Sequence, residues 1–544
     1  PPVTETEELI TVSAISVVAR PLAEPTQDAA RDAPGQVDVL LEEQLRGAGA
    51  LGLADALRQI PGVAAGPEAG EARQIAVRGV GGRFTRVRVN GMETLATFGA
   101  SNAIGGTNRG RAFDYNVFAA DLFKQVRLQK TASADLDEGS LGATVDMRTR
   151  SPLELPRRHA MLAAEAGYQT LSDRARPRVS AVLSGRDGAS RLGVLVSAAY
   201  SGRSTLEAGA SAGQWETGDA VAPGFGAALP PLDLAAVNAA LHARIPRLEL
   251  VEIDQQRLGL TGSLEWRPGD ATRIALDVIY AELRSNRREN LLESFTFRTP
   301  GVCGAPADPR CGLNAVTVTQ GDIFMYGGRK PVLIAGRFDG VDVRSEARRD
   351  ELSTVFRQTT LAASHRFREG VEGRMLLGFS RSDFSNPVQQ TLYLEQFDVD
   401  GFAYDFSDGD RPALSFGDAA LATPGAWTAS EFRSDPNWVD NSYRSLAMDL
   451  EDRTGPIDWR VGVLAKTYRT VGAARMRSDG GIGNVNSVPP GGLSGLSVAD
   501  YARLVGQGVD FGVSGAPSQW LAFDVARALA AACPDAACYE TGPG

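Results

Sequence analysis

Apolar and polar residues alternate along much of the chain after residue 153, and a period of two is typical of a half-buried β-strand. The clearest example carries Leu258, Leu260, Leu264 and Trp266 on one face and Arg257, Thr261, Ser263 and Glu265 on the other. Nine such stretches lie at about 159–169, 177–186, 190–202, 255–267, 271–284, 353–367, 373–382, 439–451 and 457–470. The pattern predicts a sheet with one apolar face, and it fits a soluble sandwich as well as a membrane barrel.

The lengths of the connections separate these two folds. Short turns lie near 186–190, 267–271, 368–373 and 452–457, whereas long links cover roughly 203–254, 285–352, 383–438 and 471–544. The first link on the long side, near 170–176, is the one short exception. Short turns on one side and long loops on the other are typical of outer-membrane barrels. A compact soluble domain seldom contains several structureless links longer than about 15 residues. We therefore expect a membrane β-barrel whose long loops are extracellular.

The first 150 residues contain short elements of mixed type. The apolar residues of Leu53–Val63 have helical spacing, and the segment ends at a Pro-Gly pair. Ile75–Gly79 has the pattern of a strand, and Arg86–Met92 has the pattern of a strand that runs into an Asn-Gly turn. In Phe118–Pro152, two alternating stretches flank a polar turn that contains glycines. These elements predict a small α+β domain ahead of the barrel.

These four segments resemble the plug domain of TonB-dependent outer-membrane receptors. In Phe118–Pro152 the resembling residues are Leu122, Val126, Lys130, Ser133, Ala134, Asp135, Asp137, Glu138, Gly139, Gly142, Val145, Thr149 and Pro152. The series Ala134-Asp135-x-Asp137-Glu138-Gly139 is similar to that of a large proteobacterial subset of the family. Leu53–Val63 resembles the element LxxxLxxxPGV, Ile75–Gly79 the element IxIRG, and Arg86–Met92 the element vxvNG. The plug-motif residues are thus Arg78, Gly79, Asn90, Gly91, Asp135, Glu138, Gly139 and Gly142.

The resemblance implies a plug domain in the lumen of a membrane β-barrel of the 22-stranded type. It divides the chain into a flexible N-terminus at 1–47, a plug domain at 48–152 and the N-terminal part of the barrel at 153–544. About nine strands do not close such a barrel, and lipid does not permit unpaired strand edges. We therefore expect the chain to be an N-terminal fragment with an incomplete barrel.

One short β-prone segment near the N-terminus follows two acidic residues. It consists of Leu9, Ile10, Thr11, Val12, Ser13 and Ala14. In the resembling family a segment of this kind is the TonB box, which implies contact with TonB. An extended strand on a flexible leash can add to the edge of a partner's sheet through main-chain hydrogen bonds. The alternative is a strand that packs into the plug, and a second β-prone patch at Ile15–Val18 leaves the register open.

A long polar loop rich in Gly, Asn, Ser, Thr and Arg lies between Met92 and Tyr115. In the resembling family, plug loops at this point face the outside and touch the substrate. The candidate donors are Asn102, Asn108, Arg109 and Arg111, whose side chains suit sugar hydroxyls or anionic groups. A solvated loop without a binding role is the alternative of equal weight.

Composition and motif content exclude several classes of function. The net charge of -10 argues against a nucleic-acid partner, and no run of about 18 apolar residues is present to form a membrane-spanning helix. The 3 histidines lie far apart in the sequence. No glycine-rich run joins a strand to a helix, and no nucleophile motif stands in a supporting context. We expect no enzyme activity, no cofactor and no metal site.

The four cysteines form two close pairs, Cys303 with Cys311 and Cys533 with Cys538, in loops rich in Gly, Pro and Asp. Such pairs suit local disulfides in an oxidising compartment. Four unrelated thiols are the alternative, and zinc is disfavoured because neither pair has CxxC spacing.

The resemblance implies active uptake of an oligosaccharide or an iron chelate across the bacterial outer membrane. The implied partners are TonB with its inner-membrane energising complex, the substrate, and outer-membrane lipid. The alternatives are a receptor that binds or signals without transport and a soluble carbohydrate-binding protein. Aromatic residues in the long links favour carbohydrate slightly, although they also suit catecholate chelators: Trp215, Phe225, Phe324, Tyr326, Trp427 and Trp438.

Overall fold

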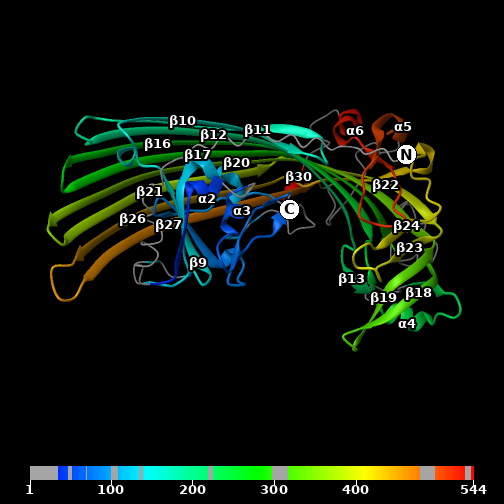
Figure 1. Cartoon of the computed structure of the whole chain (residues 1–544). Coiled ribbons are helices and arrows are strands. Elements are labelled where there is room, and N and C mark those ends of the chain that lie inside the picture. The colour runs from blue at the N-terminus through cyan, green and yellow to red at the C-terminus, as the bar shows by residue number, and fades with distance from the viewer. Residues whose placement is uncertain are drawn as a thin grey trace, which may run out of the picture.

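A computed structural model of the chain describes residues 35–46, 52–68, 70–99, 108, 110–133, 136, 139–218, 225–296, 316–477, 496–532 and 541–543. Figure 1 shows a long, curved antiparallel sheet and a smaller body of short elements against its concave face. The smaller body is built from residues before 155 and the long sheet from residues after it. We call these two parts the plug and the wall.

The plug contains a five-stranded sheet in the order β1-β8-β9-β6-β7, in which only β6 and β9 run parallel. Its strands are β1 (Val37–Leu41), β6 (Thr85–Val89), β7 (Met92–Glu93), β8 (Phe123–Gln129) and β9 (Ala143–Thr149). Two hairpin-like pairs are formed by β2 (Val63–Ala64) with β5 (Ala76–Val77) and β3 (Pro67–Glu68) with β4 (Glu71–Ala72). The helical elements are α2 (Glu42–Arg46), α3 (Leu53–Leu57), η1 (Gly82–Phe84), η3 (Tyr115–Val117), η4 (Ala120–Leu122) and η5 (Pro152–Glu154).

Alternate apolar positions of the plug strands form its core. Val87 and Val89 of β6 are buried, and so are Val126 and Leu128 of β8. Leu40 of β1 lies opposite Val126 and is buried as well. The plug sheet therefore includes residues ahead of position 48, which the sequence analysis assigned to the N-terminal segment. β1 is a strand because it pairs with β8, which lies more than 80 residues later in the chain. The sequence of β1 alone does not reveal that pairing.

The wall contains nine long strands in sequence order, each antiparallel to the next. They are β10 (Arg158–Gln169), β11 (Arg174–Arg186), β12 (Leu192–Ser211), β16 (Arg247–Gly269), β17 (Thr272–Thr296), β20 (Val341–Arg368), β21 (Val371–Asn386), β26 (Asn437–Asp452) and β27 (Trp459–Arg477). These are the nine predicted strands, and the structure confirms a β-barrel wall around an N-terminal plug. Among the described residues the wall is not closed, because β10 pairs with β11 alone.

Several wall strands continue far beyond their predicted bounds. β17 extends to Thr296 and β20 begins at Val341, and their register is continuous between Thr272 and Glu293. In these extensions both faces carry charged residues, so the apolar alternation that reveals a strand is absent. The sequence pattern therefore marked only part of each strand.

The long links fold into a cap at one end of the wall, opposite the short turns (Figure 1). The prediction that these links are structureless is wrong. The remaining strands are β13 (Trp215–Thr217), β14 (Ala227–Ala228), β15 (Leu241–Ala243), β18 (Thr317–Tyr326), β19 (Lys330–Asp339), β22 (Gln389–Val399), β23 (Phe402–Asp405), β24 (Ala413–Phe416), β25 (Thr428–Ser434), β28 (Ala502–Val505), β29 (Trp520–Phe523) and β30 (Thr541–Pro543). The helical elements are α4 (Leu234–Ala239), η7 (Pro424–Ala426), α5 (Val498–Tyr501) and α6 (Val525–Ala532). Phe338, Phe402 and Trp520 are fully buried in a hydrophobic core that belongs to the cap.

Candidate functional site

Burial on the two faces of the wall is the reverse of burial in a soluble protein. On β16, Leu260, Leu264 and Trp266 are 41%, 42% and 48% exposed, whereas Ser263 and Glu265 are buried against the plug side. Burying polar groups while apolar ones stay exposed is unfavourable in water. The arrangement is stable where the outer face meets lipid and the inner face lines a filled lumen. The predicted orientation of the alternating strands is therefore correct.

Aromatic residues border the apolar outer face. Trp266 lies opposite Leu192 at the end of the wall that carries the short turns, and Tyr200 lies further along β12 towards the cap. The nine residues from Leu192 to Tyr200 match the roughly 9–11 residues of a tilted transmembrane strand. Trp459 of β27 lies at the same end as Trp266 and is 43% exposed. In outer-membrane barrels short turns of this kind face the periplasm and long loops face the outside, and the same orientation remains the prediction for this wall.

The predicted Asn90-Gly91 turn joins β6 to β7. Its φ angles are 51° and 81°, and positive φ at both positions is what a tight type I′ hairpin requires. Asn90 Nδ2 donates to Thr149 Oγ1 at 3.0 Å, and the Thr149 N–H donates to Asn90 Oδ1 at 3.0 Å. The Gly91 N–H donates to Asp146 Oδ1 at 3.2 Å. The turn therefore fixes β6 on β9.

A second motif turn lies at Arg78-Gly79, where both residues have positive φ. The Arg78 N–H donates to the Gly62 carbonyl at 2.9 Å, and the Arg78 guanidinium donates to Gln36 Oε1 at 3.0 Å. The motif thus joins the segment after α3 to the segment before β1. This is a role within the plug.

The glycines of the last plug motif allow close approach of β6 and β9. A Cβ at Gly142 would lie 3.1 Å from Thr85 Oγ1, and a Cβ at Gly139 would lie 2.9 Å from the Arg86 guanidinium. The Gly142 N–H also donates to the Phe84 carbonyl at 3.0 Å. The motif acids Asp135 and Glu138 lie outside the described residues.

The upper plug loop is organised by one carboxylate that the sequence analysis missed. Asp114 accepts hydrogen bonds from Gln74 Nε2 at 2.7 Å, the Phe98 N–H at 2.6 Å and Asn108 Nδ2 at 3.0 Å. Arg73 Nε lies 3.3 Å away. Burial raises the pKa of Asp114, and the Arg73 charge and the hydrogen bonds oppose that shift. A lone acid between two buried aromatic residues was the signal that could have identified it.

The structure describes two of the four substrate-loop candidates, and their side chains have different surroundings. Asn108 also donates to the Ala112 carbonyl at 2.7 Å, so its amide holds the loop in place. The Arg111 side chain is exposed and remains available to a ligand. Asn102 and Arg109 lie outside the described residues. The same applies to the TonB-contact segment Leu9–Ala14 and to the disulfide candidates Cys303, Cys311, Cys533 and Cys538.

Hydrogen bonds hold the plug to the wall at several levels. Near the cap, Thr354 Oγ1 donates to the Thr97 carbonyl at 2.7 Å, and Asn441 Nδ2 donates to Thr97 Oγ1 at 2.8 Å. Lower down, Gln358 Nε2 donates to the Val89 carbonyl at 2.7 Å. Apolar contacts lie between these polar ones, for example where the rings of Phe118 and Phe356 meet edge to face. The interface is therefore mixed in character.

Ion pairs add to this interface on the other side of the plug. Arg178 of β11 lies 2.7 Å from Asp121 of the plug, and Arg46 of α2 lies 2.9 Å from the same carboxylate. At the end that carries the short turns, Ser151 donates to the buried carboxylate of Glu265. The polar inward positions that the alternation revealed are thus the positions that contact the plug.

Buried charges of both signs gather at the base of the cap. Arg344 Nη2 lies 2.7 Å from Glu395, and Arg344 Nη1 lies 3.9 Å from Glu293. Burial raises the pKa of Glu293 to about 7, with a further contribution from the nearby Glu346 charge. Burial also raises the pKa of Asp342 to about 8, and Glu395 adds to the shift.

Two features are absent from the part of the chain that the structure describes. None of its helices is long and apolar enough to cross a membrane. No three His, Cys, Asp or Glu side chains among those residues gather in a way that suits a metal ion.

Residues 29–144 match the family model described as TonB-dependent Receptor Plug Domain. A search of curated proteins finds no match. Among solved structures, the siderophore receptor PirA from Acinetobacter baumannii is 11% identical, with 84% of this chain and 79% of that chain covered and a TM-score of 0.27. The ferric enterobactin receptor PfeA from Pseudomonas aeruginosa is 13% identical, with 83% and 79% covered and a TM-score of 0.26. The copper transporter OprC is 12% identical, with 82% and 63% covered and a TM-score of 0.33.

TM-scores of this size carry no argument about the fold, so the assignment rests on the plug match and on the wall itself. The matched residues form the body that lies against the concave face of the wall. Receptors with this plug are transporters and not enzymes. The match shows that residues 29–144 form a TonB-dependent receptor plug domain, and the apolar outer face of the wall agrees with a location in the bacterial outer membrane.

Proposed function

We propose that this receptor takes up a small molecule across the outer membrane, and that TonB supplies the work that displaces the plug. The observation that supports this most directly is the folded plug against the inner face of the wall, held there by hydrogen bonds and ion pairs. A lumen filled in this way does not pass a solute without external work. The outer membrane has no ATP, so the work must come from the inner membrane.

The proposed TonB contact is Leu9–Ala14, which lies ahead of β1. The 22 residues from 15 to 36 separate it from Val37, and fully extended they span about 75 Å. β1 is the edge strand of the plug sheet and pairs with β8 alone. A pulling force on the N-terminal segment therefore reaches β1 before any other strand of the plug.

Deletion of Leu9–Ala14 from the full-length receptor tests this mechanism. We expect uptake to be lost while binding of the substrate at the cell surface is retained. Uptake at the wild-type rate would contradict the proposal. Loss of uptake in cells that carry the wild-type receptor but lack TonB separates transport from a receptor that only binds or signals.

Two substrate classes fit the cap, an oligosaccharide and an iron chelate. Phe225 and Trp427 are buried in the cap, so they do not offer ring faces to a ligand. Trp215, Phe324 and Tyr326 are 42%, 55% and 71% exposed and offer such faces. PirA and PfeA are described as siderophore and ferric enterobactin receptors, which makes the chelate the alternative to the carbohydrate that the aromatic residues favour.

The growth conditions that raise the transcript level of the receptor gene separate the two substrate classes. Induction by growth on a glycan, without a response to iron starvation, supports an oligosaccharide. Induction by iron starvation alone supports an iron chelate and contradicts the carbohydrate assignment.

A further inference from the structure

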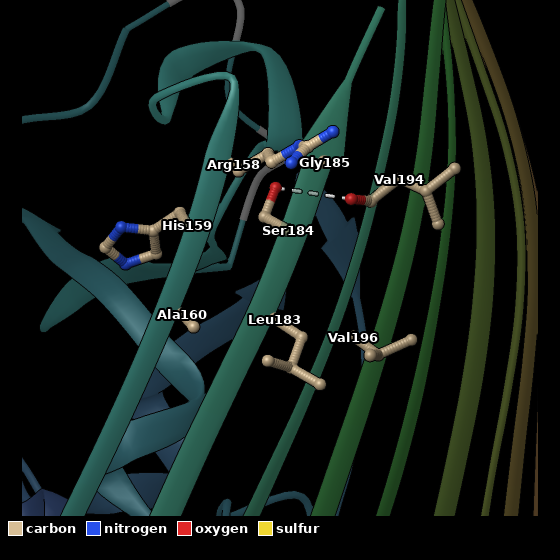
Figure 2. A pocket seen from close by; sticks show the side chains of 8 residues that line it. All are labelled: Arg158, His159, Ala160, Leu183, Ser184, Gly185, Val194 and Val196. Carbon is tan, nitrogen blue, oxygen red and sulfur yellow. Dashed lines mark hydrogen bonds between the residues drawn. The ribbon is translucent and has the colours of Figure 1, made fainter.

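The outer face of the wall carries a groove across β10, β11 and β12, with a volume of about 400 Å³. Small residues, Ala160 and Gly185, and branched residues, Leu183, Val194 and Val196, line it. Figure 2 shows Arg158 beside Gly185 at one end, with Leu183 and Val196 further along the strands. The groove thus has a cationic end and an apolar length.

The groove exists because a side chain is missing from the outer face near the end that carries the short turns. A Cβ at Gly185 would have no other heavy atom within 4 Å. The flanking side chains Leu183, Val194 and Val196 are 58%, 49% and 52% exposed, so no part of the described chain covers them. The space is open to whatever surrounds the barrel.

The position of the groove identifies its surroundings. Gly185 lies opposite Val194, two residues along β12 from Leu192, which lies opposite the border residue Trp266. The cationic end is therefore level with the lipid headgroups of the periplasmic leaflet. The apolar end, at Leu183 and Val196, points into the hydrocarbon region.

The charge at this end of the wall is strongly positive. The segments 157–160 and 183–196 contain four arginines and one acid, Asp187. The Asp187 carboxylate accepts hydrogen bonds from the backbone N–H groups of Arg191 and Leu192 at 2.6 and 3.0 Å, so it is already engaged in its turn. Neither Arg157 nor Arg158 forms an ion pair within the described part of the chain. Arg158, which lines the groove, is therefore a cation without an acidic partner among the described residues.

We propose that this groove binds an anionic diacyl phospholipid from the periplasmic leaflet of the outer membrane. The phosphate contacts the Arg158 guanidinium, since guanidinium groups pair well with phosphate oxygens. One acyl chain lies over Gly185 and along Leu183 and Val196. The lipid would stabilise the first strands of the wall from outside.

A second groove on the same outer face provides an internal comparison. It has a volume of about 700 Å³ and lies between β17 and β27, where Ile274, Met375 and Val461 line it. On β21 the even-numbered residues such as Ser380 face the plug, so the side chain of Arg374 lies on the inner face, 3.1 Å from Glu372 and 3.0 Å from Glu451, and gives this groove no cation. We expect acyl chains to enter this groove without preference for a headgroup.

Native mass spectrometry of the full-length receptor tests the proposal, with phosphatidylglycerol and phosphatidylcholine of identical acyl chains as probes. We expect the wild type to retain phosphatidylglycerol in preference. Arg158→Ala should weaken phosphatidylglycerol retention about fivefold, the loss expected for one cation near an anionic surface. Arg158→Lys should retain most of the preference, because the positive charge remains.

Gly185→Leu should reduce retention as strongly as Arg158→Ala, because its side chain fills the groove. Gly262→Leu is the matched control, since a Cβ at Gly262 on the outer side of β16 also meets no atom within 4 Å. Heat-dependent gel migration verifies that each variant is folded. Equal retention of the two lipids by the wild type, or equal effects of Gly185→Leu and Gly262→Leu, would overturn the proposal.

Discussion

Arg257 of the wall donates two hydrogen bonds to the Glu71 carboxylate of the plug, at 2.9 and 3.1 Å, and both side chains are buried. Arg203 of the neighbouring strand lies 3.4 Å from the same carboxylate. Arg257 Nε also donates to the Asn116 carbonyl at 2.6 Å. One acidic side chain thus joins the plug to two strands of the wall.

Arg257→Ala should loosen the plug. Removing one partner of a buried ion pair costs about 3–5 kcal/mol when the other charge is left unpaired, and Arg203 at 3.4 Å from Glu71 offsets part of that cost here. We expect greater sensitivity of cells to a large antibiotic that does not normally cross the outer membrane. Arg284→Ala is the control, since that guanidinium is 70% exposed and pairs with Glu282 at the surface. Equal sensitivity of the two variants would contradict a holding role for Arg257.

Gly259→Val should destabilise the contact between η4 and β16. A Cβ at this position would lie 2.6 Å from Leu122 Cδ1, and overpacking of this kind costs about 1–3 kcal/mol. Calorimetry should show a lower unfolding temperature, and the second substitution Leu122→Ala should recover part of the loss. Gly262→Val, three residues along the same strand, should have little effect because its surroundings are open. A loss that Leu122→Ala does not relieve would argue against this contact.

Asp114→Asn should release the upper plug loop. An amide nitrogen in place of one carboxylate oxygen no longer accepts a hydrogen bond, and the ion pair with Arg73 is lost. Hydrogen bonds to charged groups contribute about 1.5–3 kcal/mol, so the equilibrium constant for opening of the loop should increase at least about tenfold. Faster tryptic cleavage after the exposed Arg111 measures this change. Cleavage should be unaltered in Asp383→Asn, whose carboxylate lies on the wall beside Arg381.

The base of the cap should lose stability as the pH rises. The pKa of Glu293 is about 7 in the folded cap and 4.5 in the unfolded chain, so the unfolded chain releases its proton first. The free energy of unfolding of the cap base therefore decreases as the pH rises from about 4.5 to 7. Arg247 and Arg344 face Glu293 from β16 and β20 but do not offset the burial.

Hydrogen exchange in β22, corrected for the intrinsic rate at each pH, measures this effect. We expect more protection at pH 5 than at pH 7.5 in the wild type. Glu293→Gln should reduce the difference, because the amide does not titrate. A difference that is unchanged in the variant would assign the effect to another group, with Asp342 the next candidate.

The sequence predicted the parts of the fold in which one face is lipid-exposed and the other is not. Leu260, Leu264 and Trp266 show that contrast in the sequence, and the strand that carries them is correct. The cap escaped prediction because residues such as Phe338 and Trp520 become core only through contacts between distant links. Asn108 looked like a free donor, since the signal at its buried partner Asp114, an acid between two aromatic residues, was not used. The groove at Gly185 depends on the absence of a side chain, which a pattern of side chains does not reveal.

The mixed interface between plug and wall has a consequence for repeated operation. Groups such as Thr97, Gln358 and Asn441 exchange their protein partners for water at little net cost. A displaced plug therefore does not expose one continuous adhesive surface to its neighbours in the periplasm. In the proposed mechanism this favours the return of the plug to its place after each transport event.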